Sequence, residues 1–301
     1  MTDYAAQPLS GDDRVPIAVI GGSGLYEMDG VEIVEERNVE TPFGHPSAPI
    51  RIGQLGDRRI AFLPRHGEDH EFNPSTVPYR ANIWALKSLG VFWVLTVSAC
   101  GSLREEIAPG DFVVPDQIID KTFRRPNTMF EDIAVHAGLS YPYEPQLRDL
   151  LLEAAEVQLD EPVHDAATYV CMEGPAFSTI AESNMHRQWG ADLIGMTAMP
   201  EARLAREAEM AYATLALPTD YDVWREESPD VEVHDVLAIL NKSTALAKDL
   251  LHRLIPEIPL DAEADNPASS ALETAIVTSP EAIPESTRRT MGIILGDYLE
   301  G

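Results

Sequence analysis

Two aspartates at the end of one apolar run are spaced so that both carboxyls can serve the same ligand. Asp220 and Asp222 follow residues 211–217, a run typical of a buried strand. Residues i and i+2 of an extended strand point the same way, which predicts that the two carboxyls face one spot. Two carboxyls held close do not both ionise freely, so the pair can offer one hydrogen-bond donor and one acceptor, as the N7 and 6-amino edge of adenine requires. Two acids in an ordinary turn of an acid-rich chain are the competing interpretation.

Small and basic groups follow other apolar runs and predict an anion site. Ser23 lies in the glycine-rich turn 21–24 after one run, and Arg65 and His66 follow the next. The small residues 98–101 and the pair 196–197 follow two further runs. Glycine-rich turns expose backbone N–H groups to an anion, and arginine is the usual phosphate fork, with histidine as a second donor. Taken alone, the glycine-rich turn is explained equally well as an ordinary tight turn, and Arg65 as part of a surface salt bridge. The turn is not a dinucleotide-binding fingerprint, because Glu27 stands where the third glycine would be.

An aromatic ring and one helix face are candidate contacts for a flat base and an apolar substituent. Phe177 lies in a turn that leads into a predicted helix and can stack on a base. Val233, Val236 and Leu237 are spaced i, i+3, i+4, which places them on one face of a helix. Packing on the core explains both features equally well.

Apolar runs and helical periods alternate along the chain, which predicts a single α/β domain over residues 15–256. Strands are predicted at 15–20, 59–64, 91–97, 111–115, 192–196 and 211–217, and helices at 79–89, 145–159, 179–189 and 234–254. This order predicts a mixed, mostly parallel twisted sheet with helices on both faces, whose ligands gather at the carboxyl ends of the strands. Residues 1–14 are expected to form a flexible N-terminal segment. Residues 257–301 are rich in Ala, Pro and acids, so we expect a flexible or loosely packed tail, whose apolar run 290–295 docks elsewhere, for instance on another subunit.

The composition excludes several classes of protein. No apolar window is long enough to span a membrane, and the polar, acidic start is unlike a signal peptide. The two cysteines, Cys100 and Cys171, lack metal-ligand spacing, so we expect no metal site, no structural disulfide and a reducing cytoplasm. The formal net charge is −28, with 50 acids against 22 Lys and Arg. No basic stripe is present, which disfavours nucleic-acid binding. Such uniform acidity indicates a protein from concentrated salt, as in a halophilic archaeon, where self-repulsion is screened. An acidic protein of a low-salt cytoplasm is the alternative.

A set of motifs occurs along the chain in a specific order. With a dot for a position outside the motif, they are IGGSGLY (20–26), TPFG with PSAP (41–44, 46–49), RHG with a later His (65–70), NIWALK (82–87), SACGSLREEI.PGD (98–111), RRP (124–126), EGP.FST.AES (173–183), GMT.MPEA.LA.EA (195–208) and TDYDVW (219–224). Together they resemble the trimeric purine nucleoside phosphorylase superfamily, and within it the 5′-methylthioadenosine phosphorylases. The resemblance spans about residues 17–256. It departs from the family's pattern at Ala176 and Ile180, where the family has arginine, and the tail after residue 256 does not match.

The resemblance implies a role for each matching residue. Phosphate is expected at Ser23, Arg65, His66, Ser98, Ala99 and Thr197. The ribose is expected over Met196, and the purine against Phe177 with hydrogen bonds to Asp220 and Asp222. Substrate specificity is expected from Ser178, Val233, Val236, Leu237 and His136. The methylthio group is expected against Val233, Val236 and Leu237, and His136 is expected to reach in from a neighbouring subunit.

The resemblance also implies the reaction. Methylthioadenosine and inorganic phosphate, a co-substrate, are expected to give adenine and 5-methylthioribose 1-phosphate, with no metal or organic cofactor, in a homotrimer or a hexamer of two trimers. A related phosphorylase acting on adenosine, inosine or methylthioinosine is the alternative among enzymes. A non-catalytic purine-nucleotide-binding protein is the alternative of another class.

Overall fold

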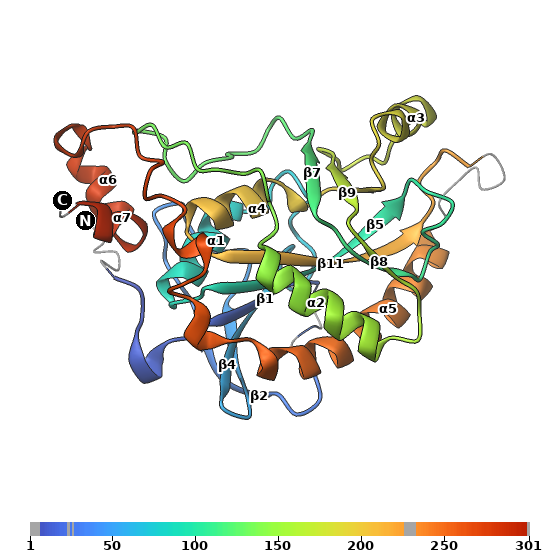
Figure 1. The fold of residues 1–301 in the computed structure, drawn as a ribbon, viewed down its shortest axis with the longest axis horizontal. Coiled ribbons are helices and arrows are strands. Elements are labelled where there is room, and N and C mark those ends of the chain that lie inside the picture. The colour runs from blue at the N-terminus through green and yellow to red at the C-terminus, as the bar shows by residue number, and fades with distance from the viewer. Residues whose placement is uncertain (1–6, 23–24, 26, 226–232, 300–301) are drawn as a thin grey trace.

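The fold is built on one mixed, twisted sheet, seen in a computed structural model that describes residues 7–22, 25, 27–225 and 233–299 (Figure 1). The eleven strands are β1 (Ile17–Gly21), β2 (Glu32–Arg37), β3 (Ile50–Leu55), β4 (Arg58–Pro64), β5 (Trp93–Ser102), β6 (Phe112–Val114), β7 (Gln117–Asp120), β8 (Val163–Asp165), β9 (Thr168–Cys171), β10 (Leu193–Gly195) and β11 (Ala211–Asp220). The main strand order is β2-β3-β4-β1-β5-β10-β9-β7, while β11 pairs with β5 and continues through β6 to β8. Strand β1 is parallel to β4 and β5, and β5 is parallel to β11. These parallel strands place several predicted ligand-binding segments at one edge.

Helices cover both faces of the sheet, as predicted. They are α1 (Tyr79–Ser88), α2 (Pro145–Gln158), α3 (Ile180–Gln188), α4 (Ala198–Glu207), α5 (Val233–Leu254), α6 (Glu285–Thr290) and α7 (Gly292–Leu299). Side chains of β1 alternate between the two faces. Ala18 and Ile20 pack in the core that contains α1 and α4, whereas Ile17 and Val19 pack in the core that contains α2 and α5. In Figure 1, α4 and α2 accordingly lie on opposite sides of β11.

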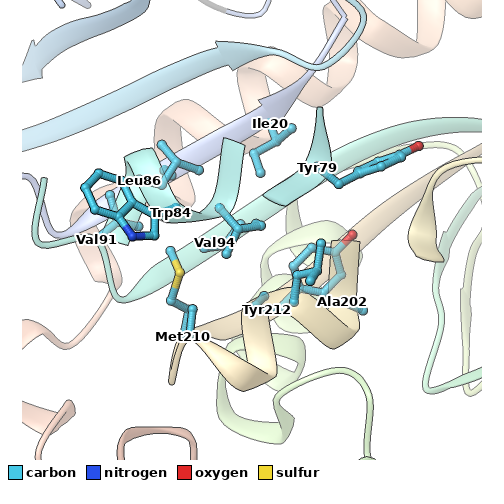
Figure 2. Packing of buried hydrophobic residues seen from close by; sticks show 14 of the residues in the cluster. Ile20, Tyr79, Trp84, Leu86, Val91, Val94, Ala202, Met210 and Tyr212 are labelled. Atoms are coloured by element: carbon cyan, nitrogen blue, oxygen red, sulfur yellow. The ribbon is translucent and has the colours of Figure 1, made fainter. Parts of the chain in front are cut away.

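The core beneath α1 is built from large side chains that are almost fully buried. Trp84 and Leu86 of α1 meet Val94 of β5, and Met210 and Tyr212 close the cluster from the β11 side (Figure 2). Each such side chain contributes roughly 1.5–3 kcal/mol when it is removed from water. This packing fixes α1 and α4 against the strands whose ends carry the candidate site.

The C-terminal segment is folded, in contrast to the flexible or loosely packed tail that its composition predicted. Leu272 and Leu295 are fully buried in the same core as α1, and Ile294 is nearly so. The indole Nε1 of Trp84 donates to the carbonyl of Thr290 at 3.0 Å. The apolar run 290–295 therefore docks on its own chain. Short helices and single 3₁₀ turns carry no sustained period, which is why the sequence pattern did not reveal them.

Part of the N-terminal segment is also attached to the body of the protein. The amide of Leu9 donates to the carbonyl of Ser88 at 2.9 Å, and Arg14 Nε donates to the carbonyl of Gly90 at 2.8 Å. Residues 7–14 therefore differ from the expected flexible segment, while residues 1–6 lie outside the described part. Within the described residues, no helix is long and apolar enough to cross a membrane.

Candidate active site

Five segments converge at the carboxyl-terminal edge of the central strands. The parallel strands β1, β4, β5 and β11 end on the same side, and the amide of Arg65 donates to the carbonyl of Gly21 at 2.8 Å. Strand β10 runs antiparallel to β5 with Leu193 opposite Ser102. Continuing this register brings Thr197 opposite Ser98, and their hydroxyl oxygens lie 2.9 Å apart. The sheet topology therefore joins residues that are far apart in sequence.

These segments enclose one cavity of about 530 Å³, a typical size for a small-molecule site. The predicted site residues that line it are Arg65, His66, Ser98, Ala99, Phe177, Met196, Thr197, Asp220, Asp222 and Leu237. The lining combines polar groups, among them Arg65 and the two aspartates, with apolar side chains such as Ile194 and Leu217. Arg65 bonds to the carbonyl of Val97, whereas Asp220 lies opposite Gly101, four residues further along β5, so the two polar regions are separated along the strand.

The two aspartates line the cavity, but not for the reason that strand alternation predicted. Strand β11 ends at Asp220, and Asp222 adopts a left-handed backbone with φ of 52°. The chain turns there, and the amide of Asp222 donates to Asp220 Oδ1 at 2.8 Å. The hydroxyl of Thr219 donates to Asp220 Oδ2, also at 2.8 Å. A local turn, rather than an extended strand, brings both carboxyls to one place.

Both carboxyls hold their protons to higher pH than an ordinary aspartate. Burial raises the pKa of Asp220, and the nearby Asp222 adds to this rise, although the hydrogen bonds from Thr219 and the Asp222 amide oppose it. Burial also raises the pKa of Asp222, against the opposing effect of the Ser183 and Ser178 hydroxyls. This agrees in direction with a carboxyl pair that can donate a proton as well as accept one.

Close packing against Gly101 holds Asp220 in place. A Cβ atom on Gly101 would lie 3.0 Å from Asp220 Oδ1 and 3.1 Å from the side chain of Ile194. Since β5 and β11 pair with Gly101 opposite Asp220, the missing side chain gives the carboxyl its room. Glycine at this point of the SACG motif therefore has a steric role.

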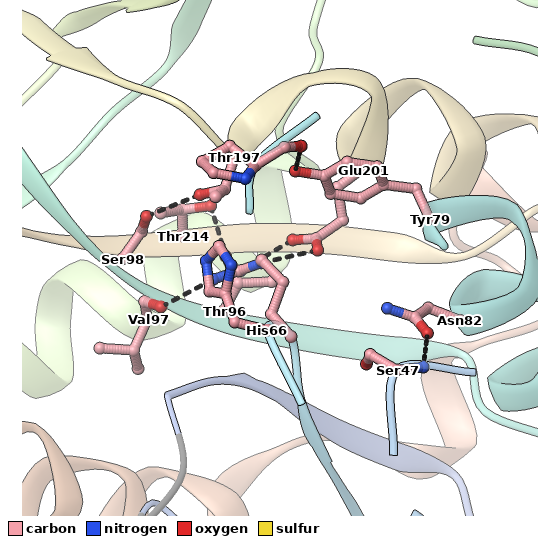
Figure 3. Close-up of polar contacts among 12 residues, drawn as sticks. Ser47, His66, Tyr79, Asn82, Thr96, Val97, Ser98, Thr197, Glu201 and Thr214 are labelled. Carbon is pink, nitrogen blue, oxygen red and sulfur yellow. Dashed lines mark hydrogen bonds and ion pairs between the residues drawn. The ribbon is translucent and has the colours of Figure 1, made fainter. Parts of the chain in front are cut away.

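Arg65 does not form the surface salt bridge that was the competing interpretation of its segment, because its partner is buried. Its Nε donates to Glu201 Oε2 and its Nη2 to Glu201 Oε1, both at 2.8 Å (Figure 3). The side chain of Arg65 is 3% exposed and that of Glu201 is fully buried. The pair is a buried, side-on bidentate ion pair at the wall of the cavity.

His66 beside it is neutral near pH 7. Burial, together with the charge of Arg65, lowers the pKa of His66 to about 4. Its Nδ1 lies 2.8 Å from the carbonyl oxygen of Phe72, which places the proton of the neutral ring on Nδ1. The other nitrogen, Nε2, can then only accept a hydrogen bond, which differs from the donor role expected of this imidazole.

A buried arginine holds the backbone at Met196. Nη1 of Arg125 donates to the carbonyl of Met196 at 2.7 Å, and Nη2 donates to the carbonyl of Glu173, also at 2.7 Å. Gly174 has φ of 66°, and a Cβ there would lie 2.5 Å from Met196 Sδ. Arg125 and the backbone at Gly174 therefore fix the position of Met196, which lines the cavity.

The remaining predicted residues fall into four groups. Phe177 and Leu237 line the cavity and are 62% and 49% exposed. Ser178 is buried next to Asp222 but is not among the lining residues. His136 is exposed and lies away from this cavity, on a segment whose amide donates to the carbonyl of Ala275. Ser23 lies outside the described residues, as do the side chains of Val233 and Val236.

Sequence reasoning missed several residues at this site. His70 lines the cavity and stacks on His66 with ring centroids 4.4 Å apart. Helix α5 contributes Leu240, Asn241 and Thr244 beyond the predicted face. Glu201 was not singled out. It is buried together with Met199, Pro200 and Ala202, so its carboxylate needs a cationic partner, but this burial becomes visible only in the structure.

Comparisons with known proteins agree with this geometry. Residues 16–256 match the family model described as the phosphorylase superfamily. The chain is 48% identical over 285 residues to the S-methyl-5′-thioadenosine phosphorylase of Geobacter sulfurreducens, covering 94% of this chain and 99% of the relative. It is 47% identical to the protein of that name from Hyperthermus butylicus, covering 92% of this chain and 100% of the relative. The chain therefore belongs to the phosphorylase superfamily, among proteins named S-methyl-5′-thioadenosine phosphorylase.

Solved structures support the same placement. A methylthioadenosine phosphorylase from an antarctic soil metagenomic library superimposes with a TM-score of 0.89 at 45% identity, covering 94% of this chain and 99% of the other. The methylthioadenosine phosphorylase of Schistosoma mansoni in complex with adenine gives a TM-score of 0.82 at 35% identity, covering 88% and 99%. The nucleoside phosphorylase fold expected from the motifs is confirmed.

Proposed function

We propose that this chain catalyses the phosphorolysis of S-methyl-5′-thioadenosine to adenine and 5-methylthioribose 1-phosphate. The observation that carries the proposal is one cavity with a carboxyl pair at one polar end and Arg65, Ser98 and Thr197 at the other. The chain covers nearly the whole length of relatives that bear this activity in their names. A base and a phosphate bound at the two ends would place the sugar between them, over Met196.

The two polar ends support complementary steps of the reaction. Cleavage of the C–N bond leaves negative charge on the base and positive charge on the sugar. We assign to Asp220 the proton shared with N7 of the leaving adenine and to Asp222 the acceptor for the 6-amino group. Phosphate held by Arg65 and the Ser98 and Thr197 hydroxyls stabilises the developing cation and then attacks C1′. In this scheme phosphate is the nucleophile, and no metal or organic cofactor is needed.

The 5′ end of the substrate is assigned to the wall formed by α5. Leu237 and Leu240 present apolar surface there. Through the resemblance to the family, we assign Val233, Val236 and His136 to the same pocket. His136 lies away from the cavity of its own chain, which supports the assignment of its contact to a neighbouring subunit in a trimer or a hexamer of two trimers. Ser178 acts on specificity through Asp222.

We propose a reducing cytoplasm with concentrated salt as the cellular setting. Cys100 and Cys171 are both buried free thiols, which fits a reducing cytoplasm. The net charge of −28 fits concentrated salt and disfavours a nucleic-acid partner.

Phosphate-dependent release of adenine tests the proposal. The purified chain is given methylthioadenosine with and without phosphate, and adenine and the sugar phosphate are followed by chromatography. Adenosine, inosine and methylthioinosine are compared with it. Because burying an unpaired 5′-hydroxyl costs about 1–3 kcal/mol, adenosine should react roughly ten- to a hundred-fold less efficiently. Adenine release that does not need phosphate would contradict phosphorolysis, and equal efficiency for adenosine would contradict the apolar 5′ pocket.

A further inference from the structure

Glu201 has the contacts of a residue that orients another side chain. Its carboxylate is fully buried, and both oxygens accept from Arg65 at 2.8 Å. The hydroxyl of Tyr212 donates to Oε1 at 2.9 Å. Because the two oxygens meet Nε and Nη2 on one side of the guanidinium, rotation of the Arg65 side chain is prevented. Figure 3 shows Glu201 on the same side of the strands as Ser98, Thr197 and His66.

The contacts of Arg65 leave a defined part of its guanidinium for a ligand. A guanidinium carries five N–H groups. Two donate to Glu201, and Nη1 donates to the carbonyl of Val97 at 3.3 Å. One N–H group of Nη1 and one of Nη2 then remain. A fixed fork of two N–H groups is the geometry that binds two oxygens of a phosphate.

Glu201 lies four residues beyond Thr197 of the same anion site, on the far side of a kink at Met199 in α4. Thr197 caps the N-terminus of α4, and its hydroxyl meets Ser98, while Glu201 is four residues further along the chain. One short element therefore carries a candidate phosphate ligand and the carboxylate that holds Arg65. If Glu201 only filled space in the core, its carboxylate would not need to accept from both Nε and Nη2 of Arg65.

The ion pair also sets the charge of the anion site. Glu201 balances the charge of Arg65, and the His66 ring is neutral near pH 7, since its pKa is about 4. The described part of the site therefore holds an anion by directed hydrogen bonds more than by net positive charge. Orientation of the donors then matters more than their number.

We propose that Glu201 is a positioning residue that fixes the Arg65 fork for inorganic phosphate. This inference rests on the proposed function. Glu201→Gln keeps the shape of the side chain but replaces one acceptor by an N–H donor facing Nη2 of Arg65. A hydrogen bond to a charged group contributes about 1.5–3 kcal/mol, so KM for phosphate should rise roughly ten- to a hundred-fold. KM for methylthioadenosine should stay within about twofold, because Asp220 and Asp222 lie at the other end of the cavity.

Tyr212→Phe is the matched control variant. It removes a neighbouring hydrogen bond to Glu201 and leaves the Arg65 pair in place, so KM for phosphate should change by less than about threefold. A double-mutant cycle with Arg65→Lys separates an effect through Arg65 from a direct one. If Glu201 acts through the fork, Glu201→Gln should add little to the loss that Arg65→Lys causes.

Binding without catalysis keeps the inference separate from the proposed activity. The rise in melting temperature on adding inorganic phosphate is measured for wild type and Glu201→Gln, with the rise on adding adenine as the reference. We expect the variant to lose most of the phosphate effect and to keep the adenine effect. Unchanged phosphate stabilisation, or equal loss of both effects, would overturn the positioning role. If Glu201→Gln does not fold, Glu201→Asp, which keeps the charge but withdraws it from the guanidinium, undergoes the same comparison. Phosphate stabilisation in wild type without phosphorolysis would instead contradict the proposed function alone.

Discussion

The carboxyl of Asp220 is expected to carry the proton on which base release depends. Asp220→Asn removes that proton, and kcat/KM for methylthioadenosine should fall about 10²- to 10⁴-fold, the usual contribution of general acid catalysis. The amide can instead donate to N7 of a 6-oxopurine, so the loss should be smaller for methylthioinosine. Steady-state kinetics on both substrates checks this. Near-native turnover of methylthioadenosine by the variant would rule out the acid role.

The pH dependence of the reaction follows from the same residue. The pKa of Asp220 is raised, chiefly by burial, so its proton persists to higher pH than on an ordinary aspartate. Activity that needs this proton should fall as the pH rises through that raised pKa. The profile of kcat/KM against pH in wild type should therefore show a basic limb that Asp220→Asn lacks. An identical limb in both proteins would assign it to another group.

Gly101 leaves the space that the Asp220 carboxyl needs. In Gly101→Ala the new methyl group would lie 3.0 Å from Asp220 Oδ1, so the carboxyl must shift by a few tenths of an ångström. KM for the nucleoside should rise several-fold, with KM for phosphate unchanged, because Arg65 is distant from the new contact. Gly138→Ala, where no atom lies within 4 Å of the new Cβ, is the control. Equal kinetics in the two variants would show that Asp220 tolerates the methyl group.

At the scale of elements, the C-terminal segment is expected to stabilise the whole fold. Leu295 of α7 is fully buried against the core of α1, so Leu295→Ala should lower the free energy of unfolding by about 2–5 kcal/mol. Val277→Ala changes a side chain that is 64% exposed and should cost less than about 0.5 kcal/mol. Urea unfolding followed by circular dichroism measures both. Equal free energies of unfolding for the two variants would contradict this stabilising role and support the flexible tail that the composition predicted.

At the scale of the whole molecule, the net charge of −28 should make stability depend on salt. The Debye length falls from about 10 Å at 0.1 M to about 3 Å at 1 M salt, which screens repulsion between surface carboxylates. The melting temperature should therefore rise toward molar KCl. The rise should shrink as the pH is lowered toward the sequence pI of about 4.5, where the net charge vanishes. Full stability and activity in dilute buffer would contradict adaptation to concentrated salt.

The sequence by itself determined the central architecture and most of the residues at its edge. The apolar runs before Gly21, Arg65 and Asp220 match β1, β4 and β11, and Gly90 follows α1 with φ of 82°, a left-handed backbone that suits glycine just after a helix. These elements are long, apolar and bounded by local signals, so the chain specifies them without reference to distant contacts. The ordered motifs placed the chain in its superfamily for the same reason. Strands β2, β3 and β7 to β9 were not predicted; β2 is an exposed edge strand, and β7 to β9 are only three or four residues long.

Only the tertiary structure decided how the site residues are held. Arg65 and Glu201 are separated by 136 positions, and no local pattern records that they form a buried pair. The carboxyls of Asp220 and Asp222 meet through a left-handed turn, and the tail folds through contacts with Trp84. In each case the arrangement depends on burial and on partners supplied by other elements. Propensity and periodicity describe neighbours along the chain, whereas burial and ion pairing are set by neighbours in space.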